Sequence, residues 1–249
     1  MKYECSWVTH TGFVRMNNED ALTVKETNGR YLLAVADGMG GHACGEVASN
    51  TIIKHLESYS DFILRSATAS ELEGTLAIVL NKAISDCRKI ITERPECAGM
   101  GTTLVLSVIL DEKVFIYHIG DSRAYHIRTN RVEFVTKDHT VAQELLDKGL
   151  ITKETFKYDP RKHILTKCIG GFSFEELQVS LEYEKMLLPA DKVLLCSDGL
   201  IDMVDTEVIL EIVNQETKSV QERAEMLLNA ALSAGGIDNV SIILLEVQE

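Results

Sequence analysis

Four apolar segments follow one another between residues 102 and 136, and they constrain the fold of this chain more than any other feature. They read TTLVLSVIL, KVFIYHIG, RAYHIR and RVEFVT, and only the pairs DE, DS and TN separate them. Parallel neighbouring strands need a crossover of a dozen or more residues, so connectors this short require antiparallel pairing. The sequence therefore predicts an antiparallel meander and not a doubly wound parallel sheet.

Amphipathic helical patterns and further strand patterns flank the meander. The predicted helices are residues 46–59, 70–91 and 219–231. Ser70 with Glu73, and Ser219 with Glu222, have the spacing of capping boxes. Additional strands are predicted at residues 20–25, 31–36, 177–184, 192–196 and 240–247. Helices grouped around antiparallel sheet indicate the α+β class.

The chain has 249 residues, of which 45% are apolar, and no low-complexity linker interrupts it. We therefore expect a single domain over residues 1–249. Residues 138–171 differ from their surroundings, because two short helical pieces, a break at Pro160 and many charged side chains follow one another there. This segment is predicted to be a surface insertion.

Net charge and cysteine usage limit the partners and the location. The net charge of −13 argues against a nucleic-acid or anionic-membrane partner, because those ligands select basic surfaces. No apolar run approaches the roughly 20 residues that span a bilayer, and the first ten residues lack the pattern of a signal peptide. Six widely separated cysteines favour reduced thiols, so we expect a cytoplasmic protein.

Aspartates recur at the ends of apolar strands. Asp37 ends the strand in YLLAVADGMGGH, and Asp198 repeats this strand-Asp-Gly pattern in KVLLCSDGL. The remaining three are Asp20 in NNEDALTV, Asp121 in HIGDSRAY and Asp238 in GGIDNVSIILL. Asp-Gly alone is a common turn pair. Five carboxylates gathered at one rim would repel one another without cations, and such hard oxygen ligands suit Mg²⁺ or Mn²⁺.

The glycines after Asp37 permit close approach of the backbone to a ligand. Neither GxxxxGK[ST] nor GxGxxG is present, so the usual nucleotide-binding loops are unsupported. Cysteine-based phosphatase chemistry is also unsupported, because no cysteine is followed by Arg after five intervening residues. The aspartyl-phosphate motif DxDx[TV] is absent as well.

Six motifs together carry a family resemblance. GFVRMNNED, VADGMGGH, GMGTTL, IGDSRAY, LLCSDGL and GGIDNVSIILL occur in this order over nearly the whole chain. The series resembles the metal-dependent protein serine/threonine phosphatases of type 2C in their compact bacterial form. The resemblance implies a four-layer sandwich of two antiparallel β-sheets flanked by α-helices, with a two-metal centre at one edge. It also implies that residues 138–171 are a mobile flap beside the site.

The resemblance assigns metal ligands by motif. Asp37 would bridge two Mn²⁺ or Mg²⁺ ions, and Asp198 and Asp238 would complete the carboxylates of the first. The Gly38 carbonyl and Asp20, through water, would serve the second. Such a pair of ions lowers the pKa of a shared water, which then attacks phosphorus in line.

Three further roles follow from the resemblance. Asp121 would help Asp198 to hold a weaker third ion. Arg15 matches the family's phosphate-binding arginine, whose planar fork suits two phosphate oxygens. His42 is a candidate proton donor to the leaving alkoxide. Met39 stands where eukaryotic members carry a histidine, so the identity of the general acid stays open.

The leading hypothesis is a Mg²⁺/Mn²⁺-dependent phosphatase that acts on phosphoserine and phosphothreonine. Its partners would be phosphorylated proteins, including a cognate serine/threonine kinase and its targets, and we expect a monomer. One alternative is a catalytically silent member that binds phosphoproteins as a regulatory protein; silent relatives commonly lose an aspartate, and all five are present here. Another is a metal-dependent phosphatase of small metabolites, which only substrate profiling separates from the first.

Overall fold

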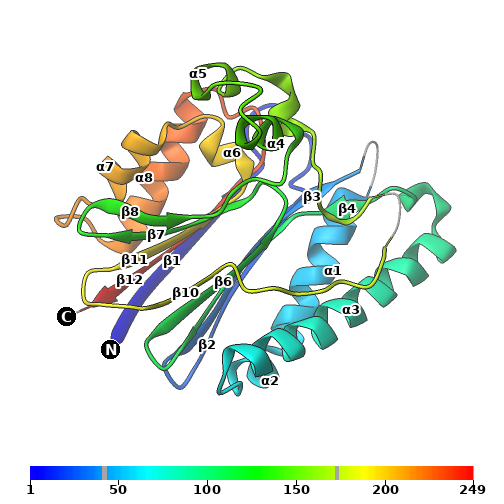
Figure 1. Cartoon of the computed structure of the whole chain (residues 1–249), viewed down its shortest axis with the longest axis horizontal. Helices are drawn as coiled ribbons and strands as arrows, with labels where there is room; N and C mark the ends of the chain where they lie inside the picture. The colour runs from blue at the N-terminus through cyan, green and yellow to red at the C-terminus, as the bar shows by residue number, and fades with distance from the viewer. Residues whose placement is uncertain (41–43, 172–173, 249) are drawn as a thin grey trace.

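Two antiparallel β-sheets pack face to face in a computed structural model that describes residues 1–40, 44–171 and 174–248 (Figure 1). The five-stranded sheet has the order β1 (Lys2–His10), β12 (Val240–Gln248), β11 (Lys192–Cys196), β7 (Arg123–Arg128) and β8 (Arg131–Val135). The seven-stranded sheet has the order β10 (Tyr183–Met186), β6 (Lys113–Ile119), β5 (Leu104–Leu110), β3 (Arg30–Met39), β4 (Gly101–Thr102) and β9 (Ile169–Gly170), and β2 (Asp20–Thr27) also pairs with β3.

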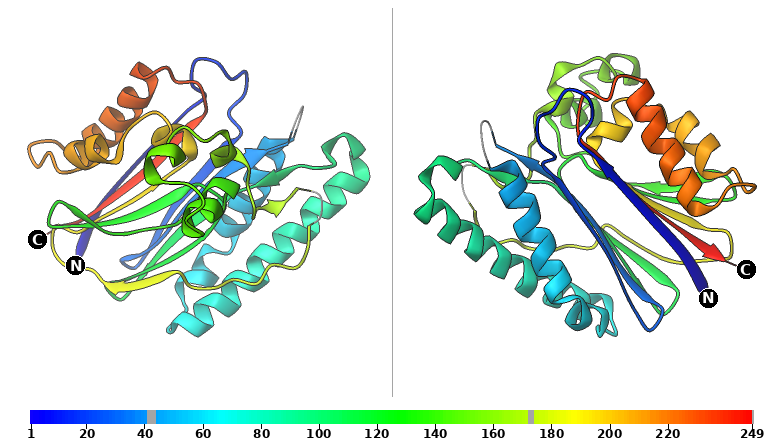
Figure 2. Two further views of the ribbon diagram at one scale, coloured as in Figure 1. Left: turned by 45° about the horizontal axis from the view of Figure 1, so that its top comes forward. Right: turned by 180° about the vertical axis from the view of Figure 1, so that it is seen from behind.

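Helices cover the outer face of each sheet (Figure 2). The seven-stranded sheet is covered by α1 (Gly45–Ser58) and α3 (Ala69–Glu93), with the short α2 (Ser60–Leu64) between them in sequence. The five-stranded sheet is covered by α6 (Asp198–Ile201), α7 (Thr206–Val213) and α8 (Val220–Ser233). The predicted α+β sandwich of four layers is confirmed.

Alternation along β3 explains how one strand joins two layers. Leu33 and Val35 lie in the core between the two sheets, whereas Leu32, Ala34 and Ala36 lie in the core beneath α1 and α3. Successive side chains of a strand point to opposite faces, so an unbroken apolar run is buried on both sides. This burial holds the strand that carries Asp37 rigidly in the middle of the fold.

The meander prediction was wrong in one respect. Its four strands form two hairpins, β5–β6 in one sheet and β7–β8 in the other. The DE and TN connectors are tight two-residue turns, in which all four residues have positive φ. The connector from Gly120 to Ser122 is no such turn and instead carries the chain from one sheet to the other. Asp121 lies in this crossing.

The start of α3 also differs from its prediction. Thr68, not Ser70, is the N-cap: its Oγ1 accepts from the Glu71 amide at 3.2 Å. Glu73 instead accepts a hydrogen bond from the amide of Leu181 at 2.8 Å. The box of Ser219 with Glu222 is confirmed at the start of α8.

The strand predicted at residues 177–184 is confirmed only for its last two residues, because β10 begins at Tyr183. The preceding segment runs along α3, where Asn81 accepts from the Leu177 amide at 2.7 Å and donates to the Leu177 carbonyl at 2.9 Å. Side chains of α3 thus supply the partners that a neighbouring strand would have given. The strand β1 was not predicted at all.

The expectation that all six cysteines are reduced was wrong. Cys44, just before α1, forms a disulfide with Cys97 in the 3₁₀-helix η1 (Pro95–Cys97). Four cysteines are free: Cys5, Cys87, Cys168 and Cys196. The bond ties the start of α1 to the segment that leads into β4.

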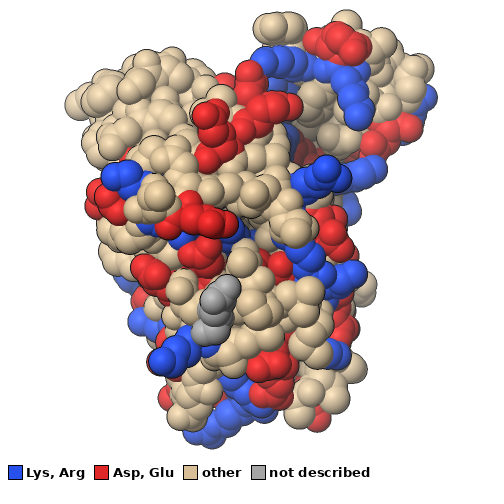
Figure 3. Space-filling model, turned by 90° about the vertical axis from the view of Figure 1, so that its left-hand side faces the viewer, with Lys and Arg blue, Asp and Glu red and all other residues tan. Residues whose placement is uncertain are grey.

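The predicted insertion contains α4 (Val141–Asp147), α5 (Lys153–Phe156) and the 3₁₀-helix η2 (Pro160–His163), and it stands at one end of the sandwich (Figure 2). On the face shown in Figure 3, acidic and basic side chains intermingle. Within the described ranges, no helix is both long enough and apolar enough to cross a bilayer.

Candidate metal centre

The aspartates singled out in the sequence lie around one end of the two sheets. Asp20 and Asp37 are directly opposite each other on β2 and β3. Asp198 opens α6 two residues after β11 ends, and Asp238 lies two residues before β12. A cleft of about 1420 Å³ is lined by Asp37, Asp121, Asp198 and Asp238, together with Arg15 and Gly38. Asp20 is buried beside Asp37, with 7% of its surface exposed.

The backbone of Asp37 is fixed by its neighbours. Its amide donates to Thr103 Oγ1 at 3.0 Å, and its carbonyl accepts from the Thr103 amide and from Thr102 Oγ1, both at 2.9 Å. Thr103 Oγ1 in turn lies 2.7 Å from Ser122 Oγ, next to Asp121. These contacts satisfy the backbone and position the carboxylate toward the cleft.

Two glycines permit close crossings of the backbone beside the aspartates. A Cβ on Gly38 would lie 2.2 Å from the Gly45 carbonyl oxygen, and one on Gly199 would lie 2.0 Å from that of Asn239. Neither position accepts a side chain without displacement of backbone. The first crossing packs the start of α1 against β3, and the second packs α6 against the residue that precedes β12.

Burial raises the pKa values of Asp20, Asp37, Asp121 and Asp198, and the charges of nearby carboxylates raise them further. For Asp37 the pKa is well above its ordinary value, chiefly because the group is buried and then because Asp198, Asp20 and Asp121 are charged. Burial and the charge of Asp121 likewise raise the pKa of Asp198. Burial raises the pKa of Asp20 to about 6, although hydrogen bonds from Ser197 and Ser241 oppose the shift. Burial and then the charge of Asp138 raise the pKa of Asp121 to about 7.

The donor set suits a hard divalent cation. Asp20 Oδ1 and Asp198 Oδ1 are buried and have no hydrogen-bond partner among the described residues. Anionic oxygens without donors, in a group whose charges repel, are the ligands that Mg²⁺ and Mn²⁺ prefer. The residues present therefore fit the ions that the sequence implied.

Arg15 reaches the same cleft from the loop between β1 and β2. Its Nη2 donates to Asp238 Oδ2 at 2.7 Å, and half of the side chain is exposed. Asn239 holds this loop in place: its Oδ1 accepts from the Glu19 amide at 2.8 Å, and its Nδ2 donates to the Asn17 carbonyl at 2.9 Å. The side chain after Asp238 thus positions the arginine loop.

The flap is fastened at its base. Arg123 donates to both carboxylate oxygens of Asp138, with two contacts of 2.7 Å. The amide of His139 donates to the Gly120 carbonyl at 2.8 Å, one residue before Asp121. The connector that carries Asp121 and the first residues of the flap are therefore a single hydrogen-bonded unit.

Two residues near the centre were not predicted from the sequence. One ligand atom each of His163, Asp198 and Asp202 lie within 4.8 Å of one another. Asp202 also accepts from Lys162 Nζ at 2.8 Å, so the flap contacts α6. Asp202 follows Asp198 by four residues, a spacing that places both on one side of a helical turn. No local signal identifies His163. The candidate His42 lies outside the described residues.

An antiparallel four-layer sandwich with an aspartate-lined cleft at its end is the architecture of metal-dependent phosphatases. The chain belongs to the protein phosphatase 2C family, whose sequence model matches residues 14–234. The family resemblance inferred from the six motifs is thereby confirmed.

Several curated relatives cover most of the chain. Serine/threonine protein phosphatase PstP of Mycobacterium tuberculosis is 37% identical over 240 residues, which are 95% of this chain and 43% of PstP. This chain thus spans less than half of that relative. Serine/threonine phosphatase stp of Listeria welshimeri is 35% identical over 96% of this chain and 93% of its own length.

Solved structures share the fold over the full chain. The catalytic domain of PstP in complex with two manganese ions has a TM-score of 0.84 and 34% identity, and the match covers 99% of each chain. Serine/threonine phosphatase Stp1 from Staphylococcus aureus has a TM-score of 0.88 and 32% identity, over 100% of this chain and 96% of its own.

Proposed function

We propose that this chain is a Mg²⁺/Mn²⁺-dependent protein phosphatase that hydrolyses phosphoserine and phosphothreonine. The observation that carries the proposal is the convergence of Asp37, Asp198 and Asp238 with Arg15 at a single cleft. Burial and then the charges of neighbouring aspartates raise the pKa values of Asp37 and Asp198 there. The proposal is supported by relatives that are named serine/threonine phosphatases, one of which has a structure with two manganese ions.

In this proposal Asp37 would be a ligand of both ions. Asp198 and Asp238 would hold the first ion, and Asp20, through water, and the Gly38 carbonyl would hold the second. Asp20 and Asp37 are neighbours across the β2–β3 ladder, which supports a shared role. When bound, the ions supply an activated water and stabilise charge on the phosphoryl group.

The chain's own cation acts on the substrate. Arg15 donates to Asp238 at 2.7 Å, and a guanidinium with half of its surface exposed can also donate hydrogen bonds to phosphate oxygens. Its role is therefore to orient the phosphoryl group, with Asn239 fixing the loop from which it reaches. Asp121 is proposed to hold a weaker third ion with Asp198. The assignment of His42 as proton donor stays a prediction.

The deciding assay measures phosphate release from a phosphothreonine peptide while Mn²⁺ or Mg²⁺ is titrated. We expect activity that requires the ion, stops in excess chelator, and falls at least a thousandfold in Asp37→Asn. The matched control is Asp61→Asn, an exposed aspartate on α2 that should retain full activity. Full activity in chelator, or an unchanged Asp37→Asn, would contradict the proposal. A panel of phosphorylated metabolites separates the small-molecule alternative.

The flap is proposed to dock protein substrates, because charged residues cover it beside the cleft. Exchange of residues 138–171 for a relative's segment should change the ranking of phosphoprotein substrates and leave turnover of a small aryl phosphate largely intact. Equal loss on both substrates would count against a docking role. A cognate kinase, its targets and a monomeric state are proposed with it.

A cytoplasmic location remains a proposal. The separated cysteines favour it, whereas the disulfide between Cys44 and Cys97 is more typical of oxidising compartments. Cell fractionation with thiol trapping of Cys97 would decide between the two compartments.

A further inference from the structure

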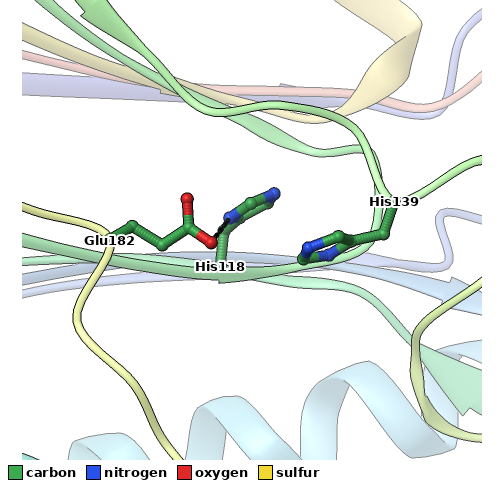
Figure 4. A group of neighbouring side chains, drawn as sticks. All are labelled: His118, His139 and Glu182. Carbon is green, nitrogen blue, oxygen red and sulfur yellow. Dashed lines mark ion pairs between the residues drawn. The ribbon is translucent and has the colours of Figure 1, made fainter. Parts of the chain in front are cut away.

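Three potential ligands meet outside the aspartate centre (Figure 4). His118 lies in β6, His139 follows Asp138 at the base of the flap, and Glu182 lies immediately before β10. One ligand atom from each residue is within 4.8 Å of the others. The proposed phosphatase reaction assigns no role to any of the three.

The buried ring of His118 has one nitrogen satisfied and one left over. Its side chain is 1% exposed, and Nε2 lies 2.7 Å from the Lys137 carbonyl oxygen. A carbonyl oxygen can only accept, so Nε2 must carry a proton and donate it. In the neutral ring, Nδ1 then carries the lone pair. Nδ1 lies 3.2 Å from Glu182 Oε1, a contact that is an ion pair when the ring carries both protons and that leaves Nδ1 without a hydrogen bond when the ring is neutral. Two lone pairs facing each other need a cation or a proton between them.

The separation of these atoms suits a shared metal ion. Nitrogen and oxygen ligands at about 2.1 Å from one ion, at a tetrahedral angle, lie about 3.4 Å apart. The observed 3.2 Å between His118 Nδ1 and Glu182 Oε1 is close to that value. A metal-binding histidine also usually donates its other ring N–H to a carbonyl or carboxylate, as His118 does to Lys137.

His139 completes the group. Its ring stacks on that of His118, with centroids 4.3 Å apart and planes 12° from parallel. Because an imidazole nitrogen binds an ion in its ring plane, both rings can bind one ion only after the His139 ring rotates out of this stack. Burial, and then the charges of His118 and Lys167, lower the pKa of His139 to about 4, so this ring is neutral at pH 7. Its Nδ1 accepts a long hydrogen bond of 3.2 Å from the Gly120 amide. If Nε2 binds an ion, the ring proton must lie on Nδ1. Nδ1 can then no longer accept from the Gly120 amide, so the ring must turn away from it.

Solvent reaches the group from two sides. His118, His139 and Glu182 line the large cleft and also a second hollow of about 490 Å³ beside α4. An ion therefore has an entry path, and water has room to supply a fourth ligand.

We propose that His118 Nδ1, His139 Nε2 and the Glu182 carboxylate bind one Zn²⁺-like ion at a site separate from the aspartates. Two imidazoles and one carboxylate suit Zn²⁺ or Co²⁺, whereas the oxygen-only aspartate site suits Mg²⁺ and Mn²⁺. The ion would join the base of the flap to β6 and to the segment before β10. It goes beyond the proposed function, because it requires no phosphatase activity.

The test titrates Co²⁺, as a spectroscopic substitute for Zn²⁺, into the whole protein held in excess Mg²⁺. Tetrahedral Co²⁺ with nitrogen ligands absorbs strongly in the visible range, whereas octahedral Co²⁺ with oxygen ligands absorbs weakly. We expect one strongly absorbing ion per chain, which Zn²⁺ displaces. Glu182→Gln and His139→Asn should each weaken its binding at least tenfold. These variants leave the buried His118 in place, and circular dichroism verifies their folding.

Two controls locate the ion. Asp37→Asn disables the aspartate centre and should keep the visible band, and His163→Asn removes the histidine beside Asp198 and should also keep it. The proposal is overturned if no strong band forms, which would make His118 and Glu182 a protonated ion pair. It is equally overturned if the band survives both Glu182→Gln and His139→Asn, or disappears in Asp37→Asn.

Discussion

Replacement of Asp20 by asparagine should stabilise the metal-free protein while it weakens the proposed metal centre. Asp20 is 7% exposed, and burial raises the pKa of its carboxyl group from 3.8 to about 6. Asparagine has nearly the same shape, and its carbonyl oxygen can accept the 2.8 Å hydrogen bond that Ser197 Oγ donates to Asp20. The substitution therefore removes a buried charge and keeps the packing.

The magnitude and its pH dependence follow from the pKa. A raised pKa means that the folded state binds the proton more tightly, so ionisation of Asp20 hardly changes the free energy of unfolding below about pH 3, where both states are protonated. The cost grows as the pH rises and is complete above about pH 6, the folded-state pKa. It then reaches about 3 kcal/mol, because each tenfold change in proton affinity corresponds to about 1.4 kcal/mol. For a chain of this size, that is about 6 to 12 °C in Tm.

The assay compares urea unfolding of the wild type and Asp20→Asn in a chelator at pH 4.5 and at pH 8. We expect the variant to be more stable by about 1 kcal/mol at pH 4.5 and by about 3 kcal/mol at pH 8. Added Mn²⁺ should stabilise the wild type more than the variant. The exposed Asp61→Asn serves as control, with little change at either pH. A gain that is absent at pH 8, or equal at both pH values, would refute the electrostatic reasoning.

Three further predictions concern the supports of the site. Arg123→Lys replaces a two-pronged contact with Asp138 by a single one, so amide hydrogen exchange in the flap should accelerate about tenfold or more, corresponding to a loss of about 1.5–3 kcal/mol. Asn239→Ala should raise KM for a phosphopeptide more than it lowers kcat, because the arginine loop loses its anchor. Cys97→Ser should lower the free energy of unfolding by about 4 kcal/mol, the value expected for a cross-link to Cys44 across 53 residues, and a reductant should reproduce this loss only in the wild type.

The sequence predicted those parts of the fold that short-range patterns determine. Apolar periodicity located α1, α3 and α8, and connector length gave antiparallel strands without any knowledge of their partners. The missed strand β1 and the short β10 depend on distant partners. β1 pairs with β12 at the opposite end of the chain, and Leu177 and Leu181 make backbone hydrogen bonds with side chains of α3 instead of with a strand.

The sequence predicted the aspartates of the candidate site, but not the hydrogen bonds and ion pairs that hold the surrounding segments in place. Asp37 and Asp198 share a strand-Asp-Gly pattern, which marked them as a pair before their positions were known. The clamp from Asn239 to the arginine loop, and the contact of Lys162 with Asp202, join segments that are far apart in sequence. Such contacts are set by the tertiary fold, so no local pattern records them.

The clustered aspartates connect the stability of this protein to its proposed chemistry. Each added carboxylate strengthens a divalent-cation site, yet it also raises the pKa values of its neighbours and so destabilises the metal-free fold at neutral pH. The burial of β3 on both faces, and the threonine hydrogen bonds that fix Asp37, offset this destabilisation. A chain that needed only this fold would gain stability by replacing the aspartates with neutral residues. Their presence on five separate segments is therefore best explained by the ions that they are proposed to bind. The direct measure is the free energy of unfolding of the wild type relative to Asp20→Asn at pH 8, compared with and without Mn²⁺.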